Sequence, residues 1–336
     1  MAAGLKLGDL RNTGWFAAST ARMSRRKLDD QEGMTKNTID VDRERITVCL
    51  AADRRFAFPL AVTLSSISAT HPGNLCRVFV IAEGFDDQSR ATIGQAAAGL
   101  DIQWLDVTDM GLDGVRLPWP DVVTKATCFR LLLPELLPSG IEKVIYLDCD
   151  TVVCGSLAEL WATPLGGGHL VAAVHDAYTP WAGAPGGTAW RELDLPPSTP
   201  YFNAGVMVIP VERWLSEDLG RRAVDLMNQR ELIYMDQCAL NALIRGAWYA
   251  LPPKWNLQSA HVNGWHFGWV VSGEAAMQEA LDSPAIVHYS SGDVKPWQTS
   301  KHDLSNKWYE ALDRTIWKGW RPTSADDRSG VTPPRL

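Results

Sequence analysis

The sequence contains no run of apolar residues approaching the roughly 20 that a membrane-spanning helix needs. Its first 23 residues also lack the continuous apolar segment of a secretion signal. The six cysteines form no Cys-x-x-Cys pair, which excludes the metal and redox motifs built on that spacing. Most of them lie in apolar runs, where cysteine packs as a small hydrophobic residue. These absences predict a cytoplasmic protein with reduced thiols that neither crosses a membrane nor is secreted.

An excess of positive charge is also missing. The chain has 32 Lys and Arg against 39 Asp and Glu, giving a formal net charge of −7. Binding to nucleic acid or to an anionic membrane requires clustered basic residues, so neither is expected as a partner. What is present is a composition of 46% hydrophobic and 21% charged residues over 336 positions, which is typical of a globular protein with a substantial core.

The two ends of the chain differ from its centre. Residues 1–44 are polar and mixed in charge, which predicts a flexible extension, and residues 321–336 are polar and contain proline, which predicts a disordered tail. Between them, residues 301–320 are predicted to form an amphipathic helix that docks on the core, with peripheral membrane contact as the weaker alternative. Its apolar residues recur at helical spacing: Leu304, Trp308, Leu312 and Ile316.

In the central part, apolar runs alternate with segments of helical periodicity. Strands are expected at 46–52, 77–82, 102–107, 143–147, 171–174, 206–209 and 285–289. Helices are expected at 59–70, 86–100 and 125–137, and from Val211 and Asp236 onward. A long Gly- and Pro-rich segment at 164–200 is predicted to be a lid or binding loop. This order predicts an α/β fold with a mostly parallel central sheet flanked by helices.

Asp148-Cys149-Asp150 follows the strand expected at 143–147, where ligands of α/β sheets collect. In an extended turn, residues two positions apart point the same way, so both carboxylates can face one hard cation. A surface pair of aspartates is the alternative. A buried strand followed by Asp-Cys-Asp-Thr-Val also resembles the nucleophile motif of haloacid-dehalogenase-like phosphatases. That family carries the motif on its first strand, whereas about three strands precede it here.

Further motifs appear in a fixed order along residues 46–297. They are Ala51-Ala52-Asp53, Phe129-Arg130-Leu131-Leu132-Leu133-Pro134-Glu135-Leu136-Leu137, Val144-Ile145-Tyr146-Leu147-Asp148-Cys149-Asp150, Phe202-Asn203-Ala204-Gly205-Val206, Asp236-Gln237 with Leu240-Asn241, Lys254-Trp255-Asn256, and His288-Tyr289 with Lys295-Pro296-Trp297. Each string is weak alone, but seven in this order resemble glycosyltransferase family 8, whose members include lipopolysaccharide galactosyl- and glucosyltransferases and glycogenin.

The resemblance implies a GT-A-type catalytic domain over residues 45–300 and a retaining hexosyltransferase that uses a UDP-sugar. The resemblance does not decide whether the transferred sugar is glucose or galactose. The acceptor is also undecided and could be a glycan, a lipid-linked sugar, a protein tyrosine or a small molecule. A catalytically inactive UDP-sugar-binding protein of the same fold is the alternative. A phosphatase of the dehalogenase type is a more distant one.

The resemblance also implies a metal site formed by the DxD motif, Asp148 and Asp150, together with His288. Such an ion, Mn²⁺ or Mg²⁺, neutralises charge on the departing β-phosphate. Mixed oxygen and nitrogen ligands suit Mn²⁺ better than Ca²⁺. Lys295 is expected to add a second positive charge at that phosphate. Between Tyr289 and Lys295, residues 290–294 are one residue longer than the family pattern, which brings the reach of Lys295 into question.

The remaining donor contacts are likewise implied by the family. Asp53 is expected near the uracil and Phe56 could stack on it, while Arg54 and Arg55 replace the residues usual there and either touch the donor or face solvent. Arg130 is expected to approach the donor, with a structural ion pair as its alternative. The implied donor-binding set is Ala51, Asp53, Phe56, Arg130, Asp148, Cys149, Asn203, Ala204, Gly205, Asp236, Gln237, Gly292 and Lys295.

Asp236 and Gln237 are the residues expected nearest the anomeric carbon. Retention requires either a double displacement by an enzyme nucleophile or a front-face route through an oxocarbenium-like ion pair. Because an amide is a poor nucleophile, the front-face route is favoured, with Asp236 binding sugar hydroxyls and Gln237 stabilising positive charge. With Lys295 they form the expected catalytic set. Four tryptophans in irregular segments are expected to border the acceptor: Trp181, Trp190, Trp265 and Trp269.

Overall fold

The computed structural model describes residues 45–322, except 74, 108–110, 113, 116, 118–123, 186–187, 263, 265–266, 293–294 and 300–301. The extension expected at 1–44 and nearly all of the tail expected at 321–336 therefore lie outside the described residues, as does Trp265.

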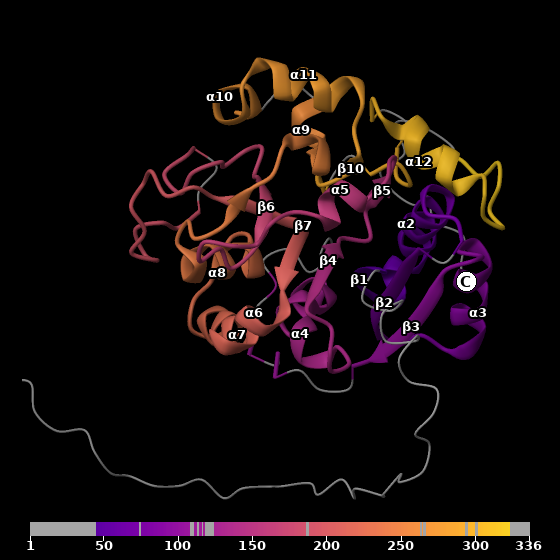
Figure 1. The fold of residues 1–336 in the computed structure, drawn as a ribbon, viewed down its shortest axis with the longest axis horizontal. Helices are drawn as coiled ribbons and strands as arrows, with labels where there is room; N and C mark the ends of the chain where they lie inside the picture. The colour runs from indigo at the N-terminus through magenta and orange to yellow at the C-terminus, as the bar shows by residue number, and fades with distance from the viewer. Residues whose placement is uncertain are drawn as a thin grey trace, which may run out of the picture. The chain divides into compact units, whose positions relative to one another are not determined.

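The first half of the chain alternates strands and helices as expected (Figure 1). Its elements are β1 (Ile46–Asp53), η1 (Arg54–Phe56), α2 (Ala57–Thr70), β2 (Cys76–Glu83), α3 (Asp87–Ala96), β3 (Asp101–Asp106), η2 (Lys125–Leu131), α4 (Leu133–Leu136), β4 (Lys143–Leu147), β5 (Thr151–Val153) and α5 (Ala158–Trp161). The second half continues with β6 (Ala172–His175), β7 (Phe202–Pro210), α6 (Val211–Ser216), α7 (Leu219–Gln229), α8 (Met235–Ile244), β8 (Tyr249–Ala250), η3 (Pro253–Trp255), β9 (Leu257–Gln258), α9 (Ser259–Val262), α10 (Gly268–Ser272), α11 (Glu274–Asp282), β10 (Ile286–His288) and α12 (Ser305–Leu312).

Seven strands form the central sheet in the order β3-β2-β1-β4-β7-β6-β8. All pairings are parallel except the two made by β7, which runs antiparallel to β4 and to β6. A second sheet of three short strands has the order β5-β10-β9. The expectation of a mostly parallel sheet is thus confirmed, with one reversed strand inside it.

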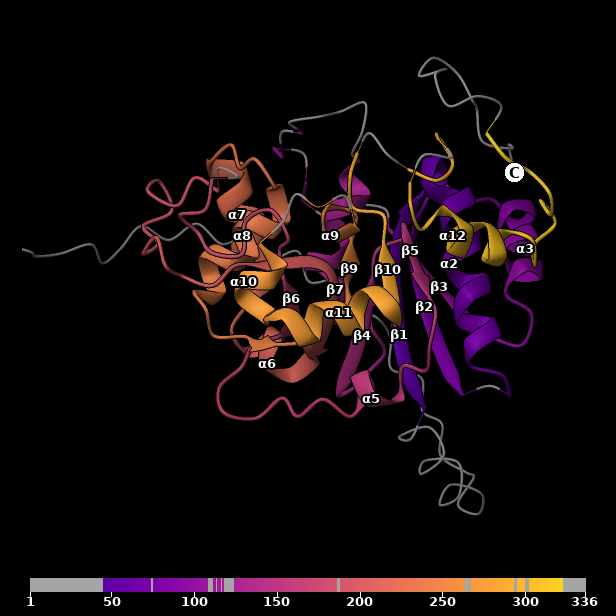
Figure 2. The ribbon, with the colours of Figure 1, turned by 90° about the horizontal axis from the view of Figure 1, so that it is seen from above.

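Side chains of β1 alternate between two hydrophobic clusters, as the period of a strand requires. Val48 and Leu50 pack with residues of α2 and α3, whereas Cys49 and Ala51 pack on the other side with residues of η2, α7 and α8. Both views place α2 and α3 beside β2 and β3, and α6, α7 and α8 near β6 (Figures 1 and 2). Burial on both faces explains why these strands read as continuous apolar runs rather than as alternating ones.

Three expected helices are broken or shorter than their periodicity suggested. The helix expected at 125–137 is a 3₁₀ helix followed by the four-residue α4, with Pro134 in the first turn of α4. The helix expected at 86–100 ends at Ala96, just before Gly99, whose φ of 89° leaves the helical region. In the C-terminal region, α12 covers only Ser305–Leu312 of the expected 301–320.

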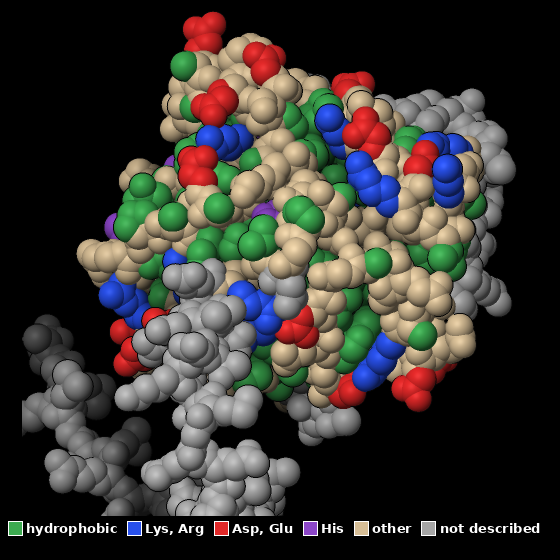
Figure 3. Space-filling view, turned by 45° about the vertical axis from the view of Figure 1, so that its right-hand side comes forward, with side chains coloured by type: hydrophobic (Ala, Val, Ile, Leu, Met, Phe, Trp, Pro, Cys, Tyr) green, Lys and Arg blue, Asp and Glu red, His purple; other side chains and the backbone are tan. Residues whose placement is uncertain are grey.

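The apolar stripe of α12 docks on the core, as expected. Trp308 and Leu312 are buried, and the Trp308 ring meets Phe58 of α2 edge-on with the ring centroids 5.3 Å apart. Ile316 is an exception, because it lies beyond the helix and is 57% exposed. On the face in Figure 3, Lys and Arg side chains are interspersed with Asp and Glu, without a broad patch of one sign. Within the described ranges, no helix has the length and apolar character to span a bilayer.

Several strands of the central sheet end at one edge, and three of them, β1, β4 and β6, carry an aspartate at or just after that end that lies next to the same region of the fold. Strands β1, β4 and β6 run in one direction, because β4 and β6 are each antiparallel to β7 and β4 is parallel to β1. Their carboxyl ends deliver Asp53, Asp148 and Asp176. This is the edge at which α/β sheets bind their ligands.

Candidate active site and metal centre

A cavity of about 750 Å³ lies at this edge of the sheet. Its wall is built by residues from the ends of β1, β4 and β6, from η2, from the first turn of α8, and from the segment after β10. The volume falls within the range of roughly 300–1,000 Å³ usual for small-molecule sites. Elements from both halves of the chain therefore contribute to one binding site.

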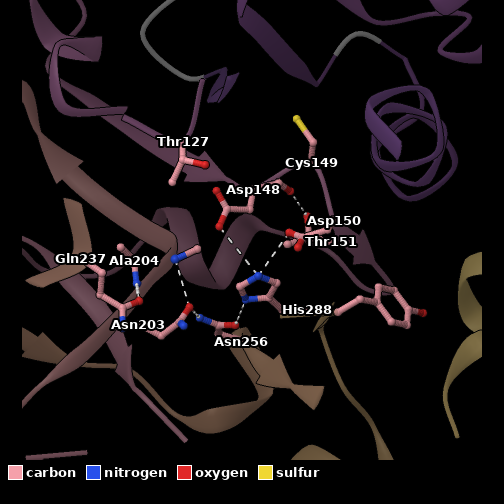
Figure 4. Close-up of polar contacts among 12 residues, drawn as sticks. Thr127, Asp148, Cys149, Asp150, Thr151, Asn203, Ala204, Gln237, Asn256 and His288 are labelled. Carbon is pink, nitrogen blue, oxygen red and sulfur yellow. Dashed lines mark hydrogen bonds and ion pairs between the residues drawn. The ribbon is translucent and has the colours of Figure 1, made fainter. Parts of the chain in front are cut away.

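Asp148, Asp150 and His288 meet in this cavity, with one ligand atom of each lying within 4.8 Å of the others. The Nε2 atom of His288 is 3.2 Å from Oδ1 of Asp150 and 3.8 Å from Oδ2 of Asp148 (Figure 4). Two carboxylates and an imidazole form a suitable ligand set for a divalent transition metal. The residues predicted as metal ligands are thus brought together.

The pairing of strands in the three-stranded sheet brings His288 close to Asp148 and Asp150. Directly after the Asp148-Cys149-Asp150 turn, β5 pairs antiparallel with β10, and Thr151 lies opposite His288. This register places the imidazole next to the turn. Gly205 leaves space for it, because a Cβ atom at that position would lie 2.2 Å from Cε1 of His288 and 2.9 Å from Oδ2 of Asp148. This close packing explains why position 205 is occupied by glycine, which has no Cβ atom.

The surroundings of Asp150 favour a bound cation. Its Oδ1 atom is buried and has no hydrogen-bond partner of good geometry, although Nε2 of His288 lies nearby. Burial alone would raise the pKa of Asp150, but the neighbouring Lys295 and His288 hold it well below its usual range. The carboxylate is therefore charged and only partly satisfied by the protein, so the donor set fits a divalent ion.

Arg130 holds the other carboxylates of the site. Its guanidinium lies 2.9 Å from Oδ1 of Asp148 and 2.9 Å from Oδ2 of Asp236, and it donates to the carbonyl of Ala204 at 2.7 Å. The Tyr146 hydroxyl donates to Asp148 at 2.8 Å. Burial raises the pKa of Asp236 to about 6, with Arg130 opposing the shift. Arg130 thus forms the structural ion pair that was its alternative role, while it also lines the cavity.

Gln237 has its amide orientation fixed by two contacts. Its Oε1 accepts a hydrogen bond from the backbone of Ala204 at 3.0 Å, and its Nε2 donates to Oδ2 of Asp176 at 3.1 Å. Just before it in α8, Met235 has a φ of 41°, a left-handed conformation that is unusual for methionine. Backbone strain of this type often occurs at functional sites.

Lys295 reaches the metal centre despite the longer segment before it. Its ammonium contacts the Asp150 carboxylate and the Tyr289 carbonyl, and the side chain is almost fully buried. Gly292 and Lys295 both line the cavity. The added residue in 290–294 therefore leaves Lys295 within the site.

All but one of the predicted site residues line the cavity. Asp53 is the exception, because its Oδ1 accepts from the backbone of Arg55 at 2.9 Å and caps η1. Arg54 faces solvent and lies 3.3 Å from Asp86. Ala51, Ala52 and Phe56 form the cavity wall at this end.

The tryptophans expected at the acceptor side do not contribute to the wall. Trp181 packs against Phe267 with the ring centroids 5.1 Å apart, and Trp190 packs against the core. Trp181, Trp190 and Trp269 are all absent from the cavity lining. Tyr178 and Tyr234 supply aromatic rings there instead.

Asp176 in the cavity wall and Asn256 behind it are among the polar residues that the sequence reasoning missed. Asp176 lines the cavity and accepts hydrogen bonds from Asn203 and Gln237, both at 3.1 Å. Its position two residues after the strand expected at 171–174 was a usable signal, the same one that identified Asp148. Asn256, which contacts Asn203 and His288, had only its place in the Lys254-Trp255-Asn256 string.

Comparison with known proteins agrees with this geometry. A sequence model described as "Glycosyl transferase family 8" matches residues 47–301. The chain belongs to this family. General stress protein A of Bacillus subtilis (strain 168) is 29% identical to this glycosyltransferase over 250 residues, which is 72% of this chain and 83% of that protein. Lipopolysaccharide 1,3-galactosyltransferase of Salmonella typhimurium is 22% identical over 315 residues, covering 88% and 87% of the two chains.

The fold of this glycosyltransferase is similar to that of a solved relative. The crystal structure of the galactosyltransferase LgtC in complex with donor and acceptor sugar analogs matches with a TM-score of 0.68 and 24% identity, covering 81% of this chain and 96% of that one. The expected GT-A-type fold is therefore confirmed. A dehalogenase-type phosphatase is not supported, because three strands precede the one that delivers Asp148 and the family match spans the motif.

Proposed function

We propose that this family 8 glycosyltransferase moves a hexose, galactose or glucose, from a UDP-sugar to a glycan, lipid-linked or small-molecule acceptor with retention of configuration. The observation that carries the proposal is the meeting of Asp148, Asp150 and His288 in a cavity large enough for a nucleotide sugar. A divalent ion bound there, Mn²⁺ or Mg²⁺, would neutralise the negative charge that develops on the departing β-phosphate.

The chain's own residues can be divided between the two ends of the donor. Ala51, Ala52 and Phe56 form an apolar wall suited to the base, although Asp53 is engaged in capping η1. The Lys295 ammonium lies at the carboxylate of Asp150, where it can also hydrogen-bond a phosphate oxygen. Diphosphate binding is therefore assigned to the metal centre and its neighbours, and the base to the end of β1.

At the sugar end, Asp236 and Gln237 line the cavity on the first turn of α8. We assign Asp236 to the sugar hydroxyls and Gln237 to stabilisation of positive charge at the anomeric carbon. In the front-face route, the bond from that carbon to the phosphate oxygen breaks as the bond to the acceptor oxygen forms on the same side. The acceptor proton passes to the departing phosphate oxygen. This route needs no nucleophile, which suits an amide already held by Ala204 and Asp176.

The proposal includes a cytoplasmic location and excludes a nucleic acid polymer as partner. Six unpaired thiols support a reducing compartment. The net charge of −7 gives no general attraction to polyanions.

Release of UDP from a panel of UDP-sugars tests the proposal. The full chain should release UDP with Mn²⁺ from UDP-glucose or UDP-galactose, and EDTA or Asp150→Ala should abolish the release. Gln278→Ala, an exposed substitution on α11, serves as the matched control that should retain release. Donor binding without release would instead identify a catalytically inactive binding protein, and release that resists both EDTA and Asp150→Ala would refute the metal-dependent mechanism.

A further inference from the structure

A chain of hydrogen bonds leads from the backbone of Gly205 through two side-chain amides to His288 (Figure 4). The Gly205 N–H donates to Oδ1 of Asn203 at 3.0 Å, and Nδ2 of Asn256 donates to the same oxygen at 2.9 Å. On its other side, Oδ1 of Asn256 lies 3.0 Å from Nδ1 of His288. These hydrogen bonds therefore connect β7, the loop before β9, and β10.

The Gly205 N–H fixes which group donates and which accepts in each of these hydrogen bonds. A backbone N–H can only donate, so Asn203 must turn its oxygen toward Gly205. Asp176 provides a second fixed point, because its carboxylate can only accept when ionised and it lies 3.1 Å from Nδ2 of Asn203. The two contacts agree on one orientation of the Asn203 amide.

The orientation of Asn203 determines that of Asn256. Because the Asn203 oxygen accepts, Asn256 must present its NH₂ group there and its oxygen to His288. An amide oxygen at that position can only accept a hydrogen bond from Nδ1, so the imidazole carries its hydrogen on Nδ1. The lone pair of Nε2 then faces the carboxylates of Asp148 and Asp150.

We propose that Asn256 is a positioning residue that fixes His288 in the Nδ1-protonated tautomer and so presents Nε2 to a divalent cation. Asn256 is fully buried, and it is not part of the cavity wall, so it acts through His288 rather than on the donor. Through Asn203, the same residue is linked to Asp176 and on to Gln237. The inference rests on the proposed function only in taking the ligand to be a metal ion.

The other tautomer would close the site to a cation. With its hydrogen on Nε2, His288 would have no lone pair on the atom that lies 3.2 Å from Oδ1 of Asp150. A metal could then bind there only after that proton had left. Groups that orient a metal-bound histidine in this way typically contribute about 10–100-fold to metal affinity.

The tautomer can be measured directly by ¹⁵N NMR of the imidazoles in the metal-free full chain, at a pH well above ordinary imidazole titration. The spectrum of His288→Gln identifies the His288 signals among the seven histidines. Native His288 should show a protonated Nδ1 and a bare Nε2. Asn256→Leu, which cannot accept a hydrogen bond from Nδ1, should shift the population to the Nε2-protonated form. Asn256→Asp loses the donor to Asn203 but keeps an oxygen acceptor for Nδ1, so it should keep Nδ1 protonated.

Mn²⁺ affinity supplies the second readout. Asn256→Leu should weaken Mn²⁺ binding by about 10–100-fold, and Asn256→Asp should recover most of it. His71→Ala is the matched control, because it removes another buried polar side chain, one that accepts from the backbone of Leu157 at 2.8 Å and does not line the cavity. It should lower the melting temperature and leave Mn²⁺ affinity unchanged.

Specific results would overturn the inference. An Nε2-protonated His288 in the native chain would do so even if Asn256→Leu fails to fold. An unchanged tautomer in Asn256→Leu, or an equal loss of Mn²⁺ affinity in His71→Ala, would also do so. If the native chain shows the expected tautomer and binds no Mn²⁺, the proposed function fails while the role of Asn256 in orienting His288 stands.

Discussion

Arg130 and Asp236 form an ion pair in the wall of the cavity, with Nε 2.9 Å from Oδ2 and both side chains almost completely buried. The same guanidinium also contacts Asp148. One arginine therefore connects the predicted metal centre to the first turn of α8, where the predicted sugar-binding residues lie.

Removing that arginine should destabilise the protein strongly. Arg130→Met leaves two carboxylates, Asp148 and Asp236, without their buried counter-charge, and breaking such a pair on one side typically costs about 3–5 kcal/mol. Urea unfolding measures the loss. Arg54→Met is the control, because Arg54 pairs with Asp86 at the surface and should contribute less than about 1 kcal/mol. Equal losses in the two variants would show that the buried pair has no special role.

Gly205→Ala should disrupt the metal centre. The added Cβ would lie 2.2 Å from Cε1 of His288, so the imidazole or β7 must move, at a cost of about 1–3 kcal/mol. We expect a lower melting temperature together with weaker Mn²⁺ binding. Gly94→Ala in α3 has no atom within 4 Å of the new Cβ and should instead stabilise by about 0.5–1 kcal/mol. Unimpaired Mn²⁺ binding by Gly205→Ala would contradict the packing argument.

His302 should make the protein sensitive to acid. Burial lowers its pKa from 6.5 to about 4, so the unfolded chain binds this proton at a higher pH than the folded one. Its contribution to stability is complete above the unfolded pKa and is lost as the pH falls toward 4. The loss should reach roughly 2 kcal/mol between about pH 7 and pH 5.

The measurement is the free energy of unfolding at both pH values for the native chain and for His302→Gln. The variant should be less stable at neutral pH, because His302 contacts Ser259 and the backbone of Leu304. Its stability should fall less on acidification. An identical pH dependence in the two proteins would argue against a neutral, buried His302.

Gln237→Ala should slow transfer without changing its stereochemical outcome. Loss of one stabilising polar group near the reacting carbon typically lowers the rate by about 10²–10³-fold. Because the front-face route forms no bond to Gln237, the residual product should keep the anomeric configuration of the donor, which NMR of the product reports. A covalent adduct between the sugar and Gln237, trapped in the native enzyme and detected by mass spectrometry, would contradict this route.

The sequence predicted the sheet and the position of the Asp148-Cys149-Asp150 turn at its edge because both depend on local signals. Strand β4 is a short apolar run that ends in Asp148, and the turn itself places Asp150 nearby. The break between η2 and α4 was missed, because the apolar spacing of 125–137 continues through Pro134. Proline is tolerated in the first turn of a helix, so its presence alone does not reveal a second, separate helix.

The polar network beside the metal centre could not be predicted in this way. Asn256 is far in the sequence from both Asn203 and His288, and its role exists only when β9 lies beside β10. For Asp53, which the family pattern assigns to the donor, the structure adds a local contact, because its carboxylate caps η1. Long-range register decides which polar residues meet, and no local pattern encodes it.

Equilibrium binding of Mn²⁺ in the presence of UDP, followed by the electron paramagnetic resonance signal of the free ion, tests the central claim most directly. The native chain should bind Mn²⁺ at a single site, and Asp150→Ala should bind it at least about 10-fold more weakly, because one of three protein ligands is gone. Equal affinity in the two proteins would mean that Asp148, Asp150 and His288 do not hold the ion, and the account would be wrong.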